Sequence, residues 1–297
     1  MLHGFNVTAA ALLGQGGESE VYALDGGRVL RVYKHGAPVA YLERRRAFYA
    51  LLRERRPPFE VPDVLEAGTA GDRYYTVERR MAGRDFAAVL PGLEGAERER
   101  ALASYLHIAG QIGALSFPER PFGEILAPGE PLQRDSWPAY LWDRLQRTLA
   151  HSRPDLEQDV PRLEALLAHV RYELRALEGF AERRLVHGDY FPGNVYIDDD
   201  LRVCGVGDFG YTTVVGDPRM DLAGAVVFLE VVDGYRPEDT PFLVRLLAEQ
   251  HGPGIAPWVA LYRLYYALYF SGCKLDDPYT YAWCVRSLQA QVIGDRS

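Results

Sequence analysis

The sequence predicts an α+β protein of two lobes, a small β-rich amino-terminal lobe with one helix and a larger, mostly helical carboxy-terminal lobe. Alternating apolar and polar residues fill much of the first 80 positions, whereas helical periodicity dominates after Gly83. A length of 297 residues lies near the limit of a single core and allows two lobes. We therefore expect one lobe over residues 1–82, a second over residues 83–297, and a short connector near 78–83.

The amino-terminal lobe shows four strand-like segments and one helix-like segment. Residues 11–34 alternate around two turn signals: Val21 and Ala23, and then residues 29–33, suit strands, and Asp25-Gly26-Gly27 favours a hairpin turn. Residues 39–55 carry an apolar stripe at helical spacing, and Pro57-Pro58 would end that helix. Residues 61–68 and 73–80 predict two further strands.

The carboxy-terminal lobe is predicted to be helical, with strands around its most informative motif. Helical periodicity covers residues 97–115, 136–150 and 161–182, separated by a proline- and glycine-rich loop and by the helix breaker Pro154. Strand-like segments follow at 185–188, 194–197 and 202–209, and helices resume from Asp217.

Charge and composition exclude several classes of function. The net charge of −8 argues against a nucleic-acid binder, which would need cations to neutralise phosphates. The charge is uneven, at +2 for residues 1–83 and −10 for the remainder. An acidic second half could attract a cationic small molecule, or could simply keep the protein soluble.

No feature of the sequence predicts a membrane partner. The start of the chain lacks the pattern of a signal peptide, and the most apolar stretch is interrupted by Glu230. The three cysteines, Cys204, Cys273 and Cys284, lack metal-ligand spacing. We expect reduced thiols in a cytoplasmic protein.

A glycine-rich segment near the start could cover phosphate groups. Gly14, Gly16, Ser19 and Val21 lie between strand-like runs, so a hairpin there could direct backbone N–H groups at an anion. The segment lacks the Gly-Lys-Ser/Thr of a P-loop and the helix of a dinucleotide fingerprint. A plain turn is the alternative.

The next strand offers a cation. Arg31 lies in mid-strand and Lys34 at its end, so either side chain could contact α- and β-phosphates. Glu43 on the following helix would be an ion-pair partner for that cation. A solvated surface arginine is the alternative.

The segment HGDYFPGN is the strongest chemical signal. Asp189 could accept a proton from an attacking hydroxyl, while Asn194 and Asp208 offer the oxygen ligands that Mg²⁺ prefers. His187 is expected to fix the loop by hydrogen bonding. Downstream, Asp217 is expected to cap a helix that begins at Pro218, and Asp221 to brace the catalytic loop.

In this order the motifs resemble the aminoglycoside phosphotransferase family of small-molecule kinases, which has a bilobal protein-kinase-like fold. The resemblance runs from the glycine loop through Arg31, Glu43 and residues 78–82 to Asp189, Asn194, Asp208-Phe209-Gly210 and residues 216–223. The spacing of Asp189 and Asn194 equals that of the protein-kinase catalytic loop. Residues 136–149 look like the substrate-side helix of the family.

The resemblance implies the roles of the individual residues. Asp189 would be the catalytic aspartate, and Asn194 and Asp208 would hold Mg²⁺. Glu78, Arg80 and Met81 would form a hinge that binds adenine, and the glycine loop would cover the phosphates of ATP. The γ-phosphoryl group would pass to a hydroxyl of a small-molecule acceptor.

Two departures leave alternatives open. Kinases carry lysine where this chain has Arg31, and Ser19 replaces the third glycine of the loop. A pseudokinase or nucleotide-binding module without turnover is therefore the alternative function. Only six residues separate Gly210 from Asp217, too few for the peptide-binding segment of a protein kinase. A small acceptor is favoured, with aminoglycoside-, choline- or homoserine-like molecules among the candidates.

Overall fold

The amino-terminal part of the chain forms an antiparallel sheet in the computed structural model, which describes residues 11–15, 19–34 and 39–294. Gly26 and Gly27 adopt positive φ angles of 72° and 68° and form the turn of the predicted hairpin. The five strands lie in the order β1-β2-β3-β5-β4. They comprise β1 (Leu12–Gln15), β2 (Ser19–Leu24), β3 (Arg28–Tyr33), β4 (Asp63–Ala70) and β5 (Arg73–Arg79).

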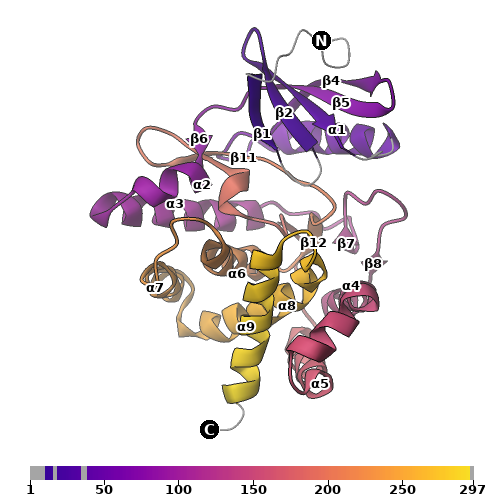
Figure 1. Ribbon diagram of the computed structural model, residues 1–297, viewed down its shortest axis with the longest axis vertical. Helices are drawn as coiled ribbons and strands as arrows, with labels where there is room; N and C mark the ends of the chain where they lie inside the picture. The colour runs from indigo at the N-terminus through magenta and orange to yellow at the C-terminus, as the bar shows by residue number, and fades with distance from the viewer. Residues whose placement is uncertain (1–10, 16–18, 35–38, 295–297) are drawn as a thin grey trace.

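One helix, α1 (Val39–Glu54), packs against this sheet and ends before the predicted proline stop (Figure 1). Its buried face follows the apolar stripe and includes Leu42, Phe48 and Leu52. Burial of that stripe outweighs the modest helix propensity of its aromatic residues. The helix therefore has a fixed face toward the rest of the molecule.

The connection to the second lobe follows β5. The short strand β6 (Arg84–Asp85) pairs with β10 (Val195–Ile197) and not with the first sheet. Gly83 adopts a φ of +86°, and a Cβ there would lie 2.7 Å from Cys204 Sγ. Only glycine fits such a close approach at positive φ. The division predicted at residue 82 falls in this connector and stays a prediction.

Two small antiparallel sheets carry the loops of the second lobe. One has the order β11-β10-β6 and the other the order β8-β7-β12-β9. The remaining strands are β7 (Phe122–Glu124), β8 (Gln133–Arg134), β9 (Arg184–Val186), β11 (Val203–Val206) and β12 (Val214–Gly216). The prediction of a plain loop over residues 116–135 was incomplete, because β12 provides a pairing partner for β7 that lies far away in sequence.

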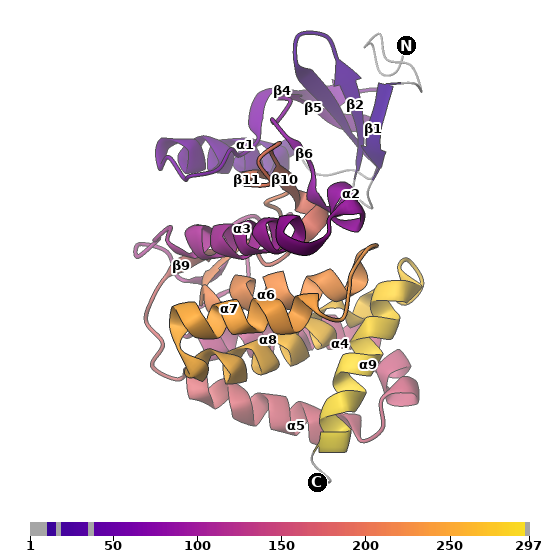
Figure 2. The same ribbon diagram turned by 90° about the vertical axis from the view of Figure 1, so that its left-hand side faces the viewer.

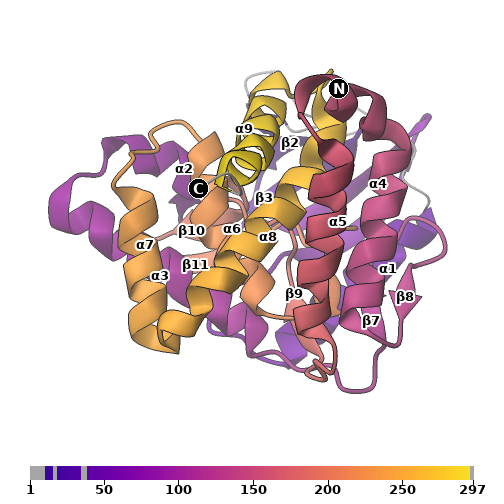
Figure 3. The ribbon, with the colours of Figure 1, turned by 90° about the horizontal axis from the view of Figure 1, so that it is seen from below.

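Helices form the rest of the second lobe. In Figure 2, α3 lies directly below the first lobe and α6, α7 and α8 lie below α3. Seen from below, α4, α5 and α8 lie side by side (Figure 3). The α-helices are α2 (Phe86–Val89), α3 (Gly95–Gly113), α4 (Trp137–Asp159), α5 (Leu163–Glu173), α6 (Arg219–Val227), α7 (Asp239–His251), α8 (Ala256–Tyr269) and α9 (Pro278–Gly294). Short 3₁₀ segments include η3 (Leu174–Leu177), η4 (Pro192–Asn194) and η7 (Phe270–Cys273).

Pro154 does not break its helix, in contrast to the prediction. Helix α4 continues through it to Asp159. The turn after Pro154 is held from outside, because Leu156 is buried and Lys274 Nζ donates to both Asp155 and Asp159 at 2.9 Å. These contacts offset the hydrogen bond that proline cannot donate. The helix predicted over 161–182 is shorter, as α5 followed by η3.

The lobes share a hydrophobic core. A single buried cluster extends from Tyr33 and Phe48 in the first lobe to Leu288 in α9. A second, smaller cluster lies within the first sheet and contains Tyr22, Leu30, Val32 and Val77. Within the described ranges, no helix is long and apolar enough to cross a membrane.

A buried ion pair joins two helices of the second lobe. Arg98 on α3 donates to both carboxylate oxygens of Asp239 on α7, at 2.7 and 2.5 Å. It also donates to the carbonyls of Leu90 and Gly234, at 2.9 and 2.7 Å. Both side chains are almost fully buried, so each charge depends on the other.

Replacing Asp239 by Ala should lower the free energy of unfolding by about 3–5 kcal/mol, because it leaves the Arg98 guanidinium buried without its counter-ion. Urea-induced unfolding would measure the change. Arg245→Ala is the matched control, since Arg245 forms an exposed pair with Glu249 and should change stability by less than about 0.5 kcal/mol. Equal effects of the two substitutions would contradict this prediction.

Candidate active site

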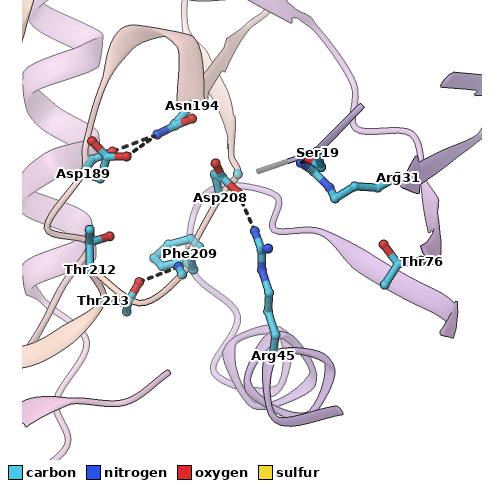
Figure 4. Close-up of polar contacts among 12 residues, drawn as sticks. Ser19, Arg31, Arg45, Thr76, Asp189, Asn194, Asp208, Phe209, Thr212 and Thr213 are labelled. Carbon is cyan, nitrogen blue, oxygen red and sulfur yellow. Dashed lines mark hydrogen bonds and ion pairs between the residues drawn. The ribbon is translucent and has the colours of Figure 1, made fainter. Parts of the chain in front are cut away.

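The loop after β9 presents Asp189 at the junction of the two lobes. Asp189 is half-buried, and the Asn194 side-chain nitrogen donates to its carbonyl oxygen at 2.9 Å. The same nitrogen lies 3.4 Å from Asp189 Oδ2 (Figure 4). Asn194 ends the 3₁₀ segment η4, so the loop returns its side chain toward Asp189. The two residues that the sequence predicted for catalysis and metal binding are therefore neighbours.

His187 fixes this loop from within the core. Its ring is fully buried, and Nε2 lies 2.8 Å from the Gly207 carbonyl oxygen, to which it donates. Nδ1 then accepts from the backbone N–H of Asp189 at 3.3 Å. Burial lowers the pKa of His187 to about 4, so the ring is neutral near pH 7. A neutral ring bonded on both sides orients the loop and has no free proton to transfer.

Asp221 holds the backbone of the same loop. Its carboxylate accepts the N–H groups of His187 at 2.6 Å and Gly188 at 2.9 Å. Burial raises the pKa of Asp221 to about 7, against the opposing effect of these two hydrogen bonds. Asp221 lies in the first turn of α6, which connects the loop to the helical core.

Gly188 is required by the shape of the loop. Its φ is +77°, and a Cβ there would lie 2.2 Å from the carbonyl oxygen of Thr212. The loop after β9 thus lies directly against the segment that leads to β12.

Tyr190 adds a third constraint on the loop. Its hydroxyl donates to the Tyr105 carbonyl at 2.9 Å, and Tyr105 donates back to the Tyr190 carbonyl at 2.5 Å. The two rings stack with centroids 4.7 Å apart. Tyr105 comes from α3, so this reciprocal pair connects the residue after Asp189 to the main helical layer.

Asp208 lies beyond the end of β11, in a loop conformation that is uncommon for a residue with a side chain. Its φ is +57°. Its Oδ1 accepts from Arg45 on α1 at 2.5 Å (Figure 4). Burial alone would raise the pKa of Asp208, but Arg45 and then Arg31 outweigh it and hold the pKa below the usual value. The carboxylate is therefore ionised at neutral pH.

The donor set fits a hard cation. The Asn194 nitrogen is directed at Asp189, which leaves the amide oxygen for a metal, and one oxygen of Asp208 lies beyond its bond to Arg45. Oxygen ligands of this kind suit Mg²⁺, which takes few protein ligands and keeps others for phosphates and water. Among the described residues, no group of three or more His, Cys, Asp or Glu side chains could hold a metal.

Phe209 anchors this segment. It is fully buried, and its ring packs at 6.1 Å from Phe48 and 4.5 Å from His187, measured between centroids. Its carbonyl oxygen accepts from Tyr49 at 3.3 Å. The Asp-Phe-Gly motif is thus fixed between α1 and the catalytic loop.

Arg31 lies in mid-strand as predicted, but the prediction of Glu43 as its ion-pair partner was wrong. Arg31 forms its ion pair with Glu78 on the adjacent strand, at 3.3 Å, and donates to Ser19 Oγ at 3.0 Å. Glu43 is exposed on α1. The reason is helical phase: the buried face of α1 carries Arg45, two residues further on, and Glu43 points outward.

Glu78 lies near the end of β5. Its backbone pairs with Val29 and Val64 within the sheet, and its Oε1 accepts from Thr76 at 2.7 Å as well as from Arg31. The Glu78 side chain is therefore bonded within the sheet to Arg31 and Thr76. Its predicted contact with adenine stays a prediction.

Arg80 and Met81, predicted as hinge residues, line a cavity of about 390 Å³ together with Arg53 of α1 and several residues of the segment that leads into β4. No catalytic-loop residue lines it. The Arg80 N–H donates to the Gly27 carbonyl at 2.8 Å, and the Ala82 N–H to Glu60 at 3.2 Å. The predicted contacts of Arg80 and Met81 with adenine stay a prediction.

The glycine loop is partly described. Gly14 lies on β1 and is paired with Val21 on β2, so the two strands frame the loop as the sequence predicted. Gly16 lies outside the described residues. The Ser19 hydroxyl accepts from Arg31, which explains a polar residue at the third glycine position.

Asp217 precedes the N-cap of α6 and is not the N-cap itself, because the helix begins one residue later than predicted. Helix α6 begins at Arg219 with Pro218 as its N-cap residue. Asp217 Oδ1 nevertheless accepts the Arg219 N–H at 3.0 Å, and Oδ2 accepts from the Tyr262 hydroxyl at 2.6 Å. The side chain is fully buried, so Asp217 supports the helix start and α8 together.

A family match now adds to this geometry. The sequence model of the phosphotransferase enzyme family matches residues 10–262. The chain belongs to this family. No curated protein sequence matches it.

Solved structures show the same fold in other phosphotransferases. The GDP complex of aminoglycoside 2'-phosphotransferase-IIIa is 14% identical with a TM-score of 0.65, over 96% of this chain and 92% of that chain. The streptomycin–ATP complex of APH(2″)-IIa is 14% identical with a TM-score of 0.60, over 94% and 90%. A candidate fructosamine-3-kinase from Haemophilus somnus 129PT is 14% identical with a TM-score of 0.62, over 95% and 89%.

The comparisons confirm the predicted class. The chain has the bilobal, protein-kinase-like α+β fold, and it is a kinase-type phosphotransferase. Its overall arrangement, a sheet with one helix above a helical lobe, is the one that the sequence predicted (Figure 1).

Sequence reasoning missed Arg45, Tyr105 and Arg144. Arg144 on α4 is buried and donates to Glu124, Tyr140 and Tyr269, at 2.9, 2.5 and 2.5 Å, beside a small crevice that Gly188 and Thr212 also line. A signal for Arg45 was present, because it falls on the apolar stripe of its helix, one turn from Leu42 and Tyr49.

The link between Asp221 and the loop predicts a pH-dependent stability. Because burial raises the pKa of Asp221 from 3.8 to about 7, its protonation favours folding. This contribution is fully present below about pH 4 and is lost as the pH rises through about 7. Between pH 6 and 8, the unfolding free energy of the wild type should fall by about 1.4 kcal/mol relative to Asp221→Asn. Urea unfolding at both pH values measures it, and a constant difference would contradict it.

Proposed function

We propose that this phosphotransferase moves the γ-phosphoryl group of ATP, with Mg²⁺, to a hydroxyl of a small molecule. The observation that carries the proposal is the side-chain hydrogen bonding of Asn194 to Asp189, with Asp208 presented by the neighbouring loop. The ATP, ADP and GDP complexes of structurally similar proteins support a nucleotide as donor.

In this proposal each residue of the chain has a distinct task. Asp189 orients the acceptor hydroxyl and accepts its proton, since it is half-buried and ionisable. Asn194 and Asp208 are the metal ligands. Bound Mg²⁺ would neutralise negative charge on the transferred group. Arg31 on β3 is bonded to Ser19 at the start of β2 and to Glu78 on β5, and it is the cation for the phosphates.

The acceptor is proposed to be small and cationic. The segment between Gly210 and Asp217 includes β12 and leaves little chain for a peptide platform. The net charge of −10 after residue 83 favours an amine-bearing acceptor such as an amino sugar or a choline-like molecule. The streptomycin and kanamycin complexes of structural neighbours are consistent with this chemistry.

The three cysteines form no disulfide, which fits the proposed cytoplasmic location.

ADP release from Mg·ATP should be stimulated by one acceptor class when aminoglycosides, choline, homoserine and sugars are offered in turn. Asp189→Asn should lower that rate by roughly 10²–10⁴-fold, because it removes the proton acceptor. Asp200→Asn is the matched control, because Asp200 is an exposed carboxylate in a turn.

Wild-type protein that binds Mg·ATP but turns over with no acceptor in a wide panel would favour the alternative, a nucleotide-binding module. Equal rates for wild type and Asp189→Asn would overturn the proposed role of Asp189.

Arg31 and Lys34 make a second test. Arg31→Met should raise the dissociation constant of Mg·ADP by about tenfold or more, because it removes the charged donor proposed to contact the phosphates. Lys34→Met should change it by less than about twofold, because Lys34 lies beyond the end of β3. Titration calorimetry would measure both. The reverse ranking would assign the phosphate contact to Lys34.

A further inference from the structure

The sequence predicted that α1 would direct the carboxylate of Glu43 toward the phosphate site. The buried face of α1 instead carries a cation, Arg45. Its side chain is 5% exposed and lies on the buried face of α1, among aromatic and aliphatic residues. Burying a guanidinium is costly unless its donors are satisfied. The hydrogen bond from the Arg45 guanidinium to Asp208 is an interaction that an apolar residue at this position could not form.

The donors of Arg45 reach three acceptors, one carboxylate and two tyrosine hydroxyls. Its NH2 group donates to Asp208 Oδ1 at 2.5 Å, while Nε donates to the Tyr49 hydroxyl at 3.2 Å. Its NH1 group donates to the Tyr33 hydroxyl at 3.3 Å. The two tyrosines fix the plane of the guanidinium, so its charge has a defined direction.

Arg31 and Arg45 belong to two separate ion pairs. Arg31 is bonded within the sheet to Glu78, and Arg45 is bonded between the lobes to Asp208. Figure 4 shows the side chains of Arg31 and Arg45 extending toward Asp208 from β3 and α1. The exposed Glu43 contributes to neither pair.

This arrangement has consequences for Asp208. The backbone of Asp208 has a φ of +57°, a conformation that is unfavourable for residues with a side chain. The bond from Arg45 therefore helps to define the position of the Asp208 carboxylate. Arg45 occupies one oxygen and leaves the other for a cation. A Mg·nucleotide complex remains an anion, so a buried positive charge beside Asp208 attracts it.

We propose that Arg45 is a positioning residue of the phosphoryl-transfer site, which fixes Asp208 and adds a second buried cation that favours polyphosphates. The inference rests on the proposed function, because it assigns Asp208 to the metal site. It replaces the strand–helix ion pair predicted from the sequence with a bond from the helix to the metal-binding carboxylate.

Binding of Mg·ADP and of adenosine to the full chain, each measured by titration calorimetry, tests the proposal. Arg45→Met should weaken Mg·ADP binding by about 10- to 100-fold, the effect of losing a charged hydrogen-bonding partner. Adenosine lacks the phosphates, so its affinity should change by less than about twofold. Arg45→Lys should recover part of the Mg·ADP affinity, because it keeps the charge but cannot contact both tyrosines and Asp208.

Arg46→Met is the matched control, since Arg46 is the exposed neighbour on the same helix. It should leave both affinities unchanged. If Arg45→Met does not fold, as judged by its thermal unfolding, the comparison rests on Arg45→Lys, which should still weaken Mg·ADP binding selectively.

Equal loss of adenosine and Mg·ADP affinity in the Arg45 variants would overturn the proposal in favour of a purely structural role. Unchanged Mg·ADP binding would also overturn it, while leaving the proposed function intact. Wild-type protein that binds no Mg·ADP would overturn the proposed function and, with it, the inference.

Discussion

The candidate active site depends on one buried carboxyl group, that of Asp221. Asp221 accepts hydrogen bonds from the consecutive N–H groups of His187 and Gly188. These two hydrogen bonds hold the backbone in the tight turn that presents Asp189. Burial disfavours the ionised form of this carboxyl group, and the two hydrogen bonds only partly offset that effect, so its pKa is raised to about 7. The turn packs against Thr212, so Asp221 positions the loop after β9 and the segment after Asp208 together.

The second constraint comes from the other lobe. Phe209 packs between Phe48 and His187, so the motif that carries Asp208 is in contact with α1 and with the catalytic loop at once. Any shift of α1 would therefore move Arg45 and Phe209 together. The hydrophobic cluster that crosses the lobe boundary makes this a stiff connection, because closely packed interiors transmit small displacements.

The sequence predicted what local patterns encode. The hairpin at Gly26-Gly27, the stripe of α1 and the loop from His187 to Asn194 follow from turn chemistry and periodicity, and the structure contains them. Partners distant in sequence were not predictable. β7 lies in a loop-like segment and is a strand because it pairs with β8 in the same segment and with β12, which is far away in sequence. Arg31 selects Glu78 over Glu43 because sheet register and helical phase, which a single sequence does not reveal, decide which side chains face each other.

The preference for arginine follows from the same geometry. Only two lysines occur in the chain, and the buried cations Arg45, Arg98 and Arg144 each bond several acceptors in different directions. A guanidinium can satisfy a carboxylate, hydroxyls and carbonyls at once, whereas an ammonium is a compact point charge. Arg31 bridges Glu78 and Ser19 in the same manner. Arg31, where kinases usually have lysine, therefore resembles the other arginines of this chain, each of which bonds several acceptors. By itself the arginine does not indicate that the site has lost its activity.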